Sequence, residues 1–160
     1  MHPPSGAVEA HKVSGGSVLN VAGMFLLLAF LLGVVSGLRT FTGPAVLWIM
    51  RHGGPWAYVL GAAAVFEYFY DVNPKARPRT SAPSVAVRLL SGAFVGWFAV
   101  VANGVSPAPG AILGAVGALV GAYGSYAVRR QCISAIGNVA SGLLEDIVAI
   151  AASVAIVARL

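Results

Sequence analysis

Charged residues are scarce in this sequence. Asp, Glu, Lys and Arg together make up only 9% of its 160 residues, whereas soluble proteins have about a quarter. Hydrophobic residues reach 58%, and the mean hydropathy is +0.85. Too few charges remain to cover a surface in water, so the composition excludes an ordinary soluble domain and predicts a membrane protein.

Cysteine and enzyme motifs are also nearly missing. The single cysteine, Cys132, excludes an internal disulfide and a cysteine-based metal cluster, and we expect it to be a small packing residue. No Ser-His-Asp arrangement, HExxH motif, P-loop or paired metal-ligand motif is present. We therefore predict no enzyme activity, no catalytic residue, no metal site and no cofactor.

The basic residues favour lipid over nucleic acid. Ten Lys and Arg stand against five Asp and Glu, and the bases lie in the gaps between apolar runs. This pattern suits anionic lipid headgroups, whereas nucleic-acid binding needs a basic helix or a similar continuous patch. We expect the lipid bilayer, and no nucleic acid, to be the partner.

Long apolar runs define the architecture. Residues 1–17 contain too little apolar surface to bury and are expected to form a disordered tail, and 18–160 a single transmembrane domain. The alternative, a cleaved secretory signal, is less favoured because the apolar run is about 20 residues long. The prediction is an all-α polytopic bundle with five full spans, namely 18–38, 55–71, 85–103, 108–128 and a last one from about Val139 to Leu160.

A sixth segment is too short to span. Pro44 to Met50 gives only seven apolar residues, which reach about 10 Å as a helix. It is expected to be a half-helix, a re-entrant segment or an interfacial helix, unless it extends back through Thr40 to Thr42. Whether it crosses the membrane decides the side of the N-terminus, and the sequence leaves this open.

The orientation follows from two basic loops. Loops 74–84 and 129–131 carry most of the bases between spans and fall on the same side under either helix count. The positive-inside rule places both in the cytoplasm, as expected for a multi-pass protein of the bacterial inner membrane.

Glycines at regular spacing predict close helix packing. Five glycines of the 108–128 span alternate at four and three residues, which aligns them along one stripe, and two further spans each carry a GxxxG pair. Packing within one bundle is preferred to a homo-oligomer interface, although both stay open. The predicted packing glycines are Gly33, Gly37, Gly92, Gly96, Gly110, Gly114, Gly117, Gly121 and Gly124.

Acidic residues are the functional candidates, because a carboxylate inside a membrane is costly and tends to face a cavity or a partner. Glu67 and Asp71 are four residues apart and share one helix face. Glu67 has to reach the interface, take a proton, or pair with a base such as Arg88. Glu145 and Asp146 are adjacent and point about 100° apart, so they do not form one paired site. For this second pair, a surface position near a helix start and a buried cation or proton site are equally weighted.

The two halves of the chain have a similar plan. On either side of residue 82, a glycine-rich span is followed by a Pro-Gly break and then by a helix with an acid. Three elements per half would give an inverted 3+3 repeat, as in some transporters.

Several motifs are similar to those of a known family. They are the run from Ser36 to Pro44, Glu67-x-x-x-Asp71-x-x-Pro74, Pro78-Arg79-Thr80, Arg88 with Gly92-Ala93, and Leu143-Leu144-Glu145-Asp146. Together they resemble the bacterial membrane family called domain of unknown function 4126, over about residues 20 to 158. The resemblance implies a helical inner-membrane protein without an established activity. The loop at 51–55 is shorter than is usual in that family.

Seven charged residues form the candidate site, on the hypothesis that clustered charges lower one another's cost of burial. They are Arg39, Glu67, Asp71, Arg79, Arg88, Glu145 and Asp146.

Three functions fit this cluster. The leading hypothesis is a small transporter or channel-like protein, in which Glu67 and Glu145 bind a proton or cation and the break at Thr42 to Pro44 permits gating. The main alternative is a structural or assembly protein, whose glycine stripe packs against partner helices and whose acids pair with arginines. A third is a lipid-directed role, in which the bases of loop 74–84 hold anionic headgroups.

Overall fold

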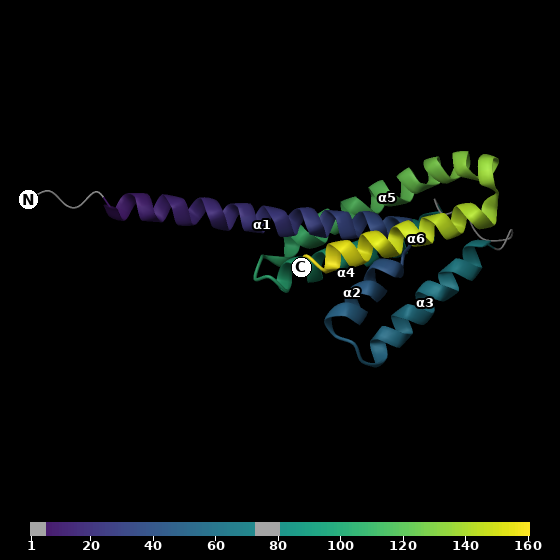
Figure 1. Cartoon of the computed structure of the whole chain (residues 1–160), viewed down its shortest axis with the longest axis horizontal. Helices are drawn as coiled ribbons and strands as arrows, with labels where there is room; N and C mark the ends of the chain where they lie inside the picture. The colour runs from purple at the N-terminus through teal and green to yellow at the C-terminus, as the bar shows by residue number, and fades with distance from the viewer. Residues whose placement is uncertain (1–5, 73–80) are drawn as a thin grey trace, which may run out of the picture.

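The computed structural model describes residues 6–72 and 81–160, and this part of the chain is helical throughout, without strands. It contains six helices (Figure 1). The all-α prediction is confirmed for these residues. The helices are α1 (Gly6–Leu38), α2 (Thr42–Arg51), α3 (Pro55–Val72), α4 (Ala82–Val101), α5 (Pro107–Ile136) and α6 (Asn138–Val157).

Four helical segments of the described residues are long and apolar enough to cross a membrane. They are Asn20–Leu38, Ala82–Val101, Pro107–Ser134 and Asn138–Val157. Their length and composition fit the membrane class that the sequence predicts. The five full spans of the sequence prediction are not confirmed, because α3, which has 18 residues and carries Glu67 and Asp71, is not among the four.

Two helices extend beyond their predicted ends. α1 already begins at Gly6, so a helix covers residues 6–17, where the sequence predicts a tail. α5 continues to Ile136 and not only to residue 128, because no Gly or Pro interrupts it before Gly137. Gly137 has a φ of +83°, a left-handed conformation that suits glycine and turns the chain directly into α6.

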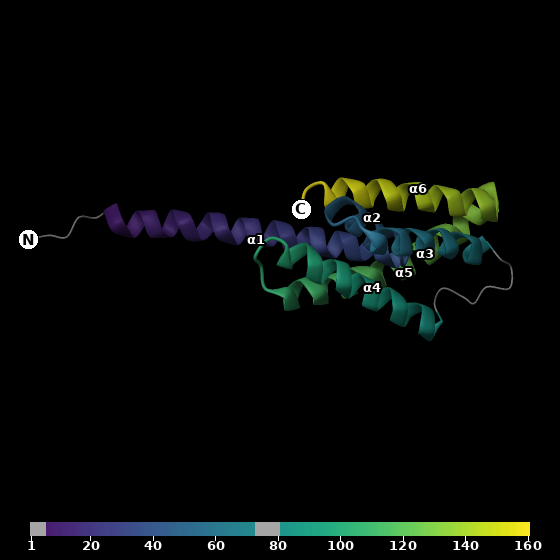
Figure 2. The same cartoon turned by 90° about the horizontal axis from the view of Figure 1, so that it is seen from below.

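The centre of the bundle consists of α1, α4 and α5, with α5 packed along both of the others. α4 and α6 lie on opposite sides of α1 (Figure 2). A buried cluster of small and branched side chains from α1, α2, α4 and α6 fills the interior near the end where the chain terminates. The cluster comprises Ala29, Leu32, Leu47, Val95, Ala99, Val100 and Val157.

The glycine stripe of α5 is what allows this close approach. A Cβ atom added at Gly114 would overlap the Gly92 carbonyl oxygen of α4 and lie 2.9 Å from Gly96 Cα. One added at Gly121 would overlap the Val34 carbonyl oxygen of α1 and lie 3.0 Å from Gly37 Cα. Gly33, Gly110 and Gly117 meet a neighbouring helix in the same way, whereas nothing lies within 4 Å of the Cβ position at Gly124. Backbone contact at small residues is how helices associate in lipid, and here it joins helices of the same chain.

α2 reverses the chain at one end of the bundle. α1 ends where α3 also ends and where α5 turns into α6, and α2 runs back from this point toward the opposite end (Figure 1). Its 10 residues span about 15 Å, so it is a half-helix. Gly43 fits the turn because a Cβ there would lie 2.6 Å from the Ser36 hydroxyl of α1. The C-terminus consequently lies at the end of the bundle from which the first part of α1 projects (Figure 1).

The predicted inverted repeat gains no support from these helices. In the repeat, α2 and α5 occupy equivalent places after the two breaks. α2 has 10 residues and α5 has 30, and only α5 is long enough to span.

Candidate functional site

The break between α1 and α2 is where most of the candidate charges meet. A helix end leaves backbone carbonyl groups without partners, and in lipid no water is available to bind them. The guanidinium of Arg88, from α4, fills this role: its Nη1 donates to the carbonyl oxygens of Gly37 and Leu38, the latter at 3.0 Å. Arg88 is only 3% exposed, so its guanidinium group makes these contacts inside the bundle and not at the surface.

Glu67 binds the free backbone N–H groups on the other side of the same break. Its Oε1 accepts from the backbone N–H of Thr40 at 2.7 Å, and its Oε2 accepts from that of Phe41 at 3.0 Å. Arg88 Nη2 lies 3.9 Å from Glu67 Oε1, which adds a longer ion pair. The carboxylate thus caps the start of α2, where the helix dipole favours negative charge.

Arg39 links the break to α6. Its Nε lies 2.6 Å from Asp146 Oδ1, and its Nη2 donates to the Gly142 carbonyl oxygen at 3.3 Å. The guanidinium carbon also lies 5.9 Å from the centre of the Tyr68 ring, within reach of a cation–π interaction. Arg39 is 1% exposed, so α6 is attached to the break through a buried charge.

Glu145 belongs to a different place. Its Oε2 lies 3.0 Å from Arg129 Nη1 of α5, and Arg129 Nη2 donates to Asn138 Oδ1 at 3.0 Å. This ion pair is largely buried, with the two side chains 9% and 11% exposed. It lines a cavity of about 380 Å³ between α1, α5 and α6, together with Ser125 and Ser141.

The structure therefore divides the predicted cluster. Four of its members, Arg39, Glu67, Arg88 and Asp146, gather at the break, whereas Glu145 faces α5 and lines another cavity. The side chain of Asp71 and the whole of Arg79 lie outside the described residues.

Two partners were not predicted from the sequence. Arg129 was assigned to a cytoplasmic loop, but because α5 runs on to Ile136 it sits within the helix and faces Glu145. The lack of a helix breaker between Val128 and Gly137 is the signal that would have found it. Ser91, whose hydroxyl donates to the Thr40 carbonyl oxygen, gave no signal, because a serine in an apolar run is common in membrane helices.

The charged residues form two arrangements that differ in what they can do chemically. The break is a set of mutually satisfied charges and backbone groups, which suits a fixed junction. The Glu145–Arg129 pair lies at the wall of a cavity, where a small species can reach it. Replacing a buried ion pair by apolar residues is often neutral or stabilising, so the three such pairs among the described residues are poorly explained by stability alone.

No protein-family model, curated protein or solved structure matches this chain. The resemblance to the domain of unknown function 4126 family stays a prediction, and the function has to be argued from the site.

Proposed function

We propose that this protein is a small transporter-like membrane protein and that the cavity at Glu145 and Arg129 receives the transported or coupling species. The observation that carries this proposal is the buried ion pair at the wall of a cavity of about 380 Å³. Ionisable groups inside membrane segments are costly, and they commonly mark ion or proton pathways.

A proton fits this cavity better than a metal cation. The guanidinium of Arg129 already neutralises Glu145 and would repel a metal ion placed beside it. Within the described residues no three His, Cys, Asp or Glu side chains come together to hold a metal. A proton needs no set of ligands: it would bind one carboxylate oxygen of Glu145, while Arg129 keeps its hydrogen bond to Asn138.

A shift of α6 at Glu145 would also move Asp146, which contacts the α1–α2 break. Asp146 is the neighbour of Glu145 in α6 and holds Arg39, so the two adjacent acids attach α6 to α5 and to the α1–α2 break. Loss of the Glu145–Arg129 pair would weaken the attachment of α6 to α5. α6 would then shift relative to Arg39, which Asp146 holds at the break. In this proposal Glu67 and Arg88 keep the break intact while α6 moves.

The proposal includes a location and an orientation. The protein lies in the bacterial cytoplasmic membrane, with the basic segments 74–84 and 129–131 at the cytoplasmic face and with α2 and α3 entering from that face and returning to it as a re-entrant pair. The distribution of Lys and Arg supports this orientation. Both ends of the chain would then face outward.

A structural or assembly function is less well supported. From Gly110 to Gly121, the glycine stripe is covered by α1 and α4 of the same chain, so a partner helix would have to bind another surface. The pairing of the acids with arginines, which that function also requires, is equally compatible with transport.

Ion flux into proteoliposomes tests the proposal. Vesicles containing the protein, a pH-sensitive dye and an ionophore for charge balance are given a proton gradient. The proposal predicts proton entry faster than in protein-free vesicles, and loss of this excess in Glu145→Gln. Glu9→Gln, the same substitution near the start of α1, should keep wild-type flux.

Two results would count against the proposal. The first is no flux above protein-free vesicles under a proton, Na⁺ or K⁺ gradient. The second is unchanged flux in Glu145→Gln, which would remove Glu145 from the pathway.

A further inference from the structure

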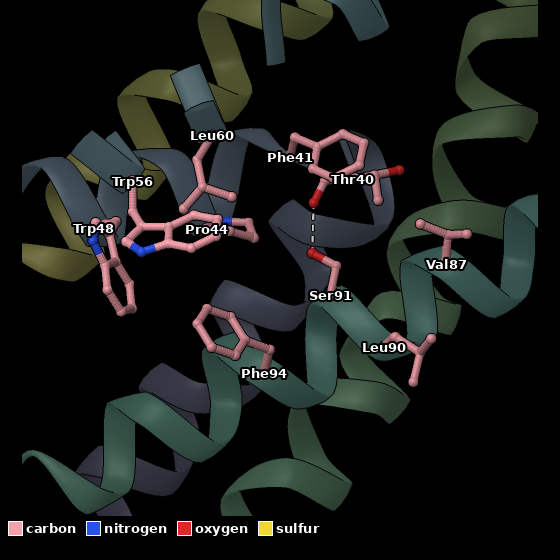
Figure 3. Close-up of a pocket in the computed structure, with 10 residues that line it drawn as sticks. All are labelled: Thr40, Phe41, Pro44, Trp48, Trp56, Leu60, Val87, Leu90, Ser91 and Phe94. Carbon is pink, nitrogen blue, oxygen red and sulfur yellow. Dashed lines mark hydrogen bonds between the residues drawn. The ribbon is translucent and has the colours of Figure 1, made fainter. Parts of the chain in front are cut away.

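A second hollow lies between α3 and α4 and is independent of the Glu145 cavity. α3 packs against α2 and α6, and a cavity of about 400 Å³ separates it from α4. Figure 3 shows aromatic and aliphatic side chains of α2, α3 and α4 around this cavity. They include Pro44 and Trp48 of α2, Trp56 and Leu60 of α3, and Leu90 and Phe94 of α4.

A polar hollow continues the apolar one. It has a volume of about 320 Å³ and shares Thr40, Phe41 and Val87 with the apolar part. The two parts form one groove, which we call the α3–α4 groove. Its apolar half lies toward the α2–α3 turn, and its polar half lies where α3 ends and α4 begins. The combined volume lies in the range of about 300–1,000 Å³ that is usual for ligand sites.

The polar half is rich in hydrogen-bond donors. The hydroxyl groups of Tyr70, Ser81 and Ser84 line it beside Arg88, whose Nε already donates to Ser84 Oγ at 3.4 Å and whose Nη1 donates to the end of α1. Its carboxylate, Glu67, already accepts from two backbone N–H groups. Ser81 Oγ is buried and has no hydrogen-bond partner within the described residues. A ligand that matches this half must therefore offer acceptors.

The start of α4 adds to this preference. Ser81 is the N-cap residue of this 20-residue helix and makes no side-chain capping bond. The first turn of α4 presents the N–H groups of Ala82 and Ser84, Pro83 having none, and the positive end of the helix dipole, which together favour an anion. Phosphate is the acceptor-rich anion of membrane lipid headgroups.

We infer that the α3–α4 groove binds one membrane phospholipid, with its phosphate at Ser81 and Ser84 and an acyl chain along the apolar half. The order of the two halves matches a lipid in the bilayer, since the polar half lies at an end of the bundle and the apolar half lies deeper. Within the groove Arg88 offsets the charge of Glu67, so the preference for an anion rests on the hydroxyl groups and on the start of α4.

Native mass spectrometry of the detergent-purified protein tests this inference. The probes are phosphatidylglycerol, diacylglycerol with the same chains, and inorganic phosphate. We expect one phosphatidylglycerol to be retained, about tenfold more tightly than diacylglycerol, because one or two hydrogen bonds to the phosphate are lost in the latter. Inorganic phosphate alone should not be retained, because it lacks the chain.

A matched pair of variants locates the site. Val87→Trp fills the groove, whereas Val116→Trp places the same side chain on α5, outside the α3–α4 groove. The two valines are 45% and 44% exposed, so neither change disturbs the core. Retention of phosphatidylglycerol should fall about tenfold in the first variant only.

A second variant separates headgroup from chain recognition. Ser81→Ala with Ser84→Ala should bring phosphatidylglycerol down to the level of diacylglycerol while leaving diacylglycerol unchanged. If Val87→Trp does not fold, the double serine variant tests phospholipid binding by itself. Equal retention of the two lipids by the wild type, or equal loss in both tryptophan variants, would overturn the inference and indicate only surrounding bilayer lipid.

Discussion

Removing the negative charge of Glu67 should destabilise the protein, because this carboxylate holds two backbone N–H groups at the α1–α2 break. In Glu67→Gln, one side-chain oxygen remains as an acceptor and an amide NH₂ replaces the other. The N–H of either Thr40 or Phe41 then faces a donor.

The magnitude follows from these two bonds. A buried N–H left without a partner costs about 1–3 kcal/mol, and turning a charge-assisted bond into a neutral one costs about 1 kcal/mol more. The Arg88 pair adds less, because its Nη2 lies 3.9 Å from Glu67 Oε1 and Arg88 keeps the carbonyl oxygens of Gly37 and Leu38. The expected loss is about 2–4 kcal/mol, or roughly 30- to 1,000-fold in the unfolding equilibrium.

Equilibrium unfolding in mixed detergent micelles measures this loss. The protein in a mild detergent is titrated with sodium dodecyl sulfate, and helix content is followed by circular dichroism. Glu9→Gln, the same substitution near the start of α1, is the comparison, and it should lose about 0.5 kcal/mol or less. A Glu67→Gln protein as stable as the wild type within about 0.5 kcal/mol would refute the capping role.

Three further predictions concern packing, charge and topology. Gly114→Ala should cost about 1–3 kcal/mol through overlap with α4, whereas Gly124→Ala, with open space at its Cβ, should be neutral or stabilising by up to about 1 kcal/mol; the same unfolding titration checks both, and equal effects would contradict the packing. Arg39→Met should cost about 3–5 kcal/mol, because it removes the buried guanidinium that holds the Asp146 carboxylate and the Gly142 carbonyl oxygen of α6; a loss below about 1 kcal/mol would mean that this pair is not buried in the membrane. In a cysteine-free background, Ser106→Cys and Ser134→Cys should react with a membrane-impermeant maleimide from opposite sides, the first from outside the cell; labelling from the same side would contradict the topology.

The class of fold could be read from the sequence because it depends on composition. Apolar runs of about 20 residues have few alternatives to a membrane helix, and the spans over α1, α4, α5 and α6 follow them closely. The predicted end of α5 was wrong for a physical reason. The sequence pattern predicts a boundary at Arg129 and Arg130, but basic residues do not stop a helix, whereas the left-handed backbone at Gly137 does.

Less of the candidate site than of the fold could be predicted from the sequence. Arg39, Glu67 and Arg88 stand out because charges are costly in lipid, but their partners are largely backbone groups, which no sequence pattern marks. The separation of Glu145 from Glu67 depends on how α6 is rotated against α5 and α1. Adjacent acids point in different directions on any helix, and only the packing of that helix decides what each one meets.

Hydrogen exchange at the break tests the central claim most directly, namely that side chains and not water satisfy its backbone groups. Amide exchange is followed residue by residue by NMR on the protein in micelles. The N–H groups of Thr40 and Phe41 should exchange at least about 30-fold more slowly than that of Ser106 in the α4–α5 loop, and Glu67→Gln should remove this protection. Exchange at Thr40 and Phe41 as fast as at Ser106 in the wild type would contradict the account.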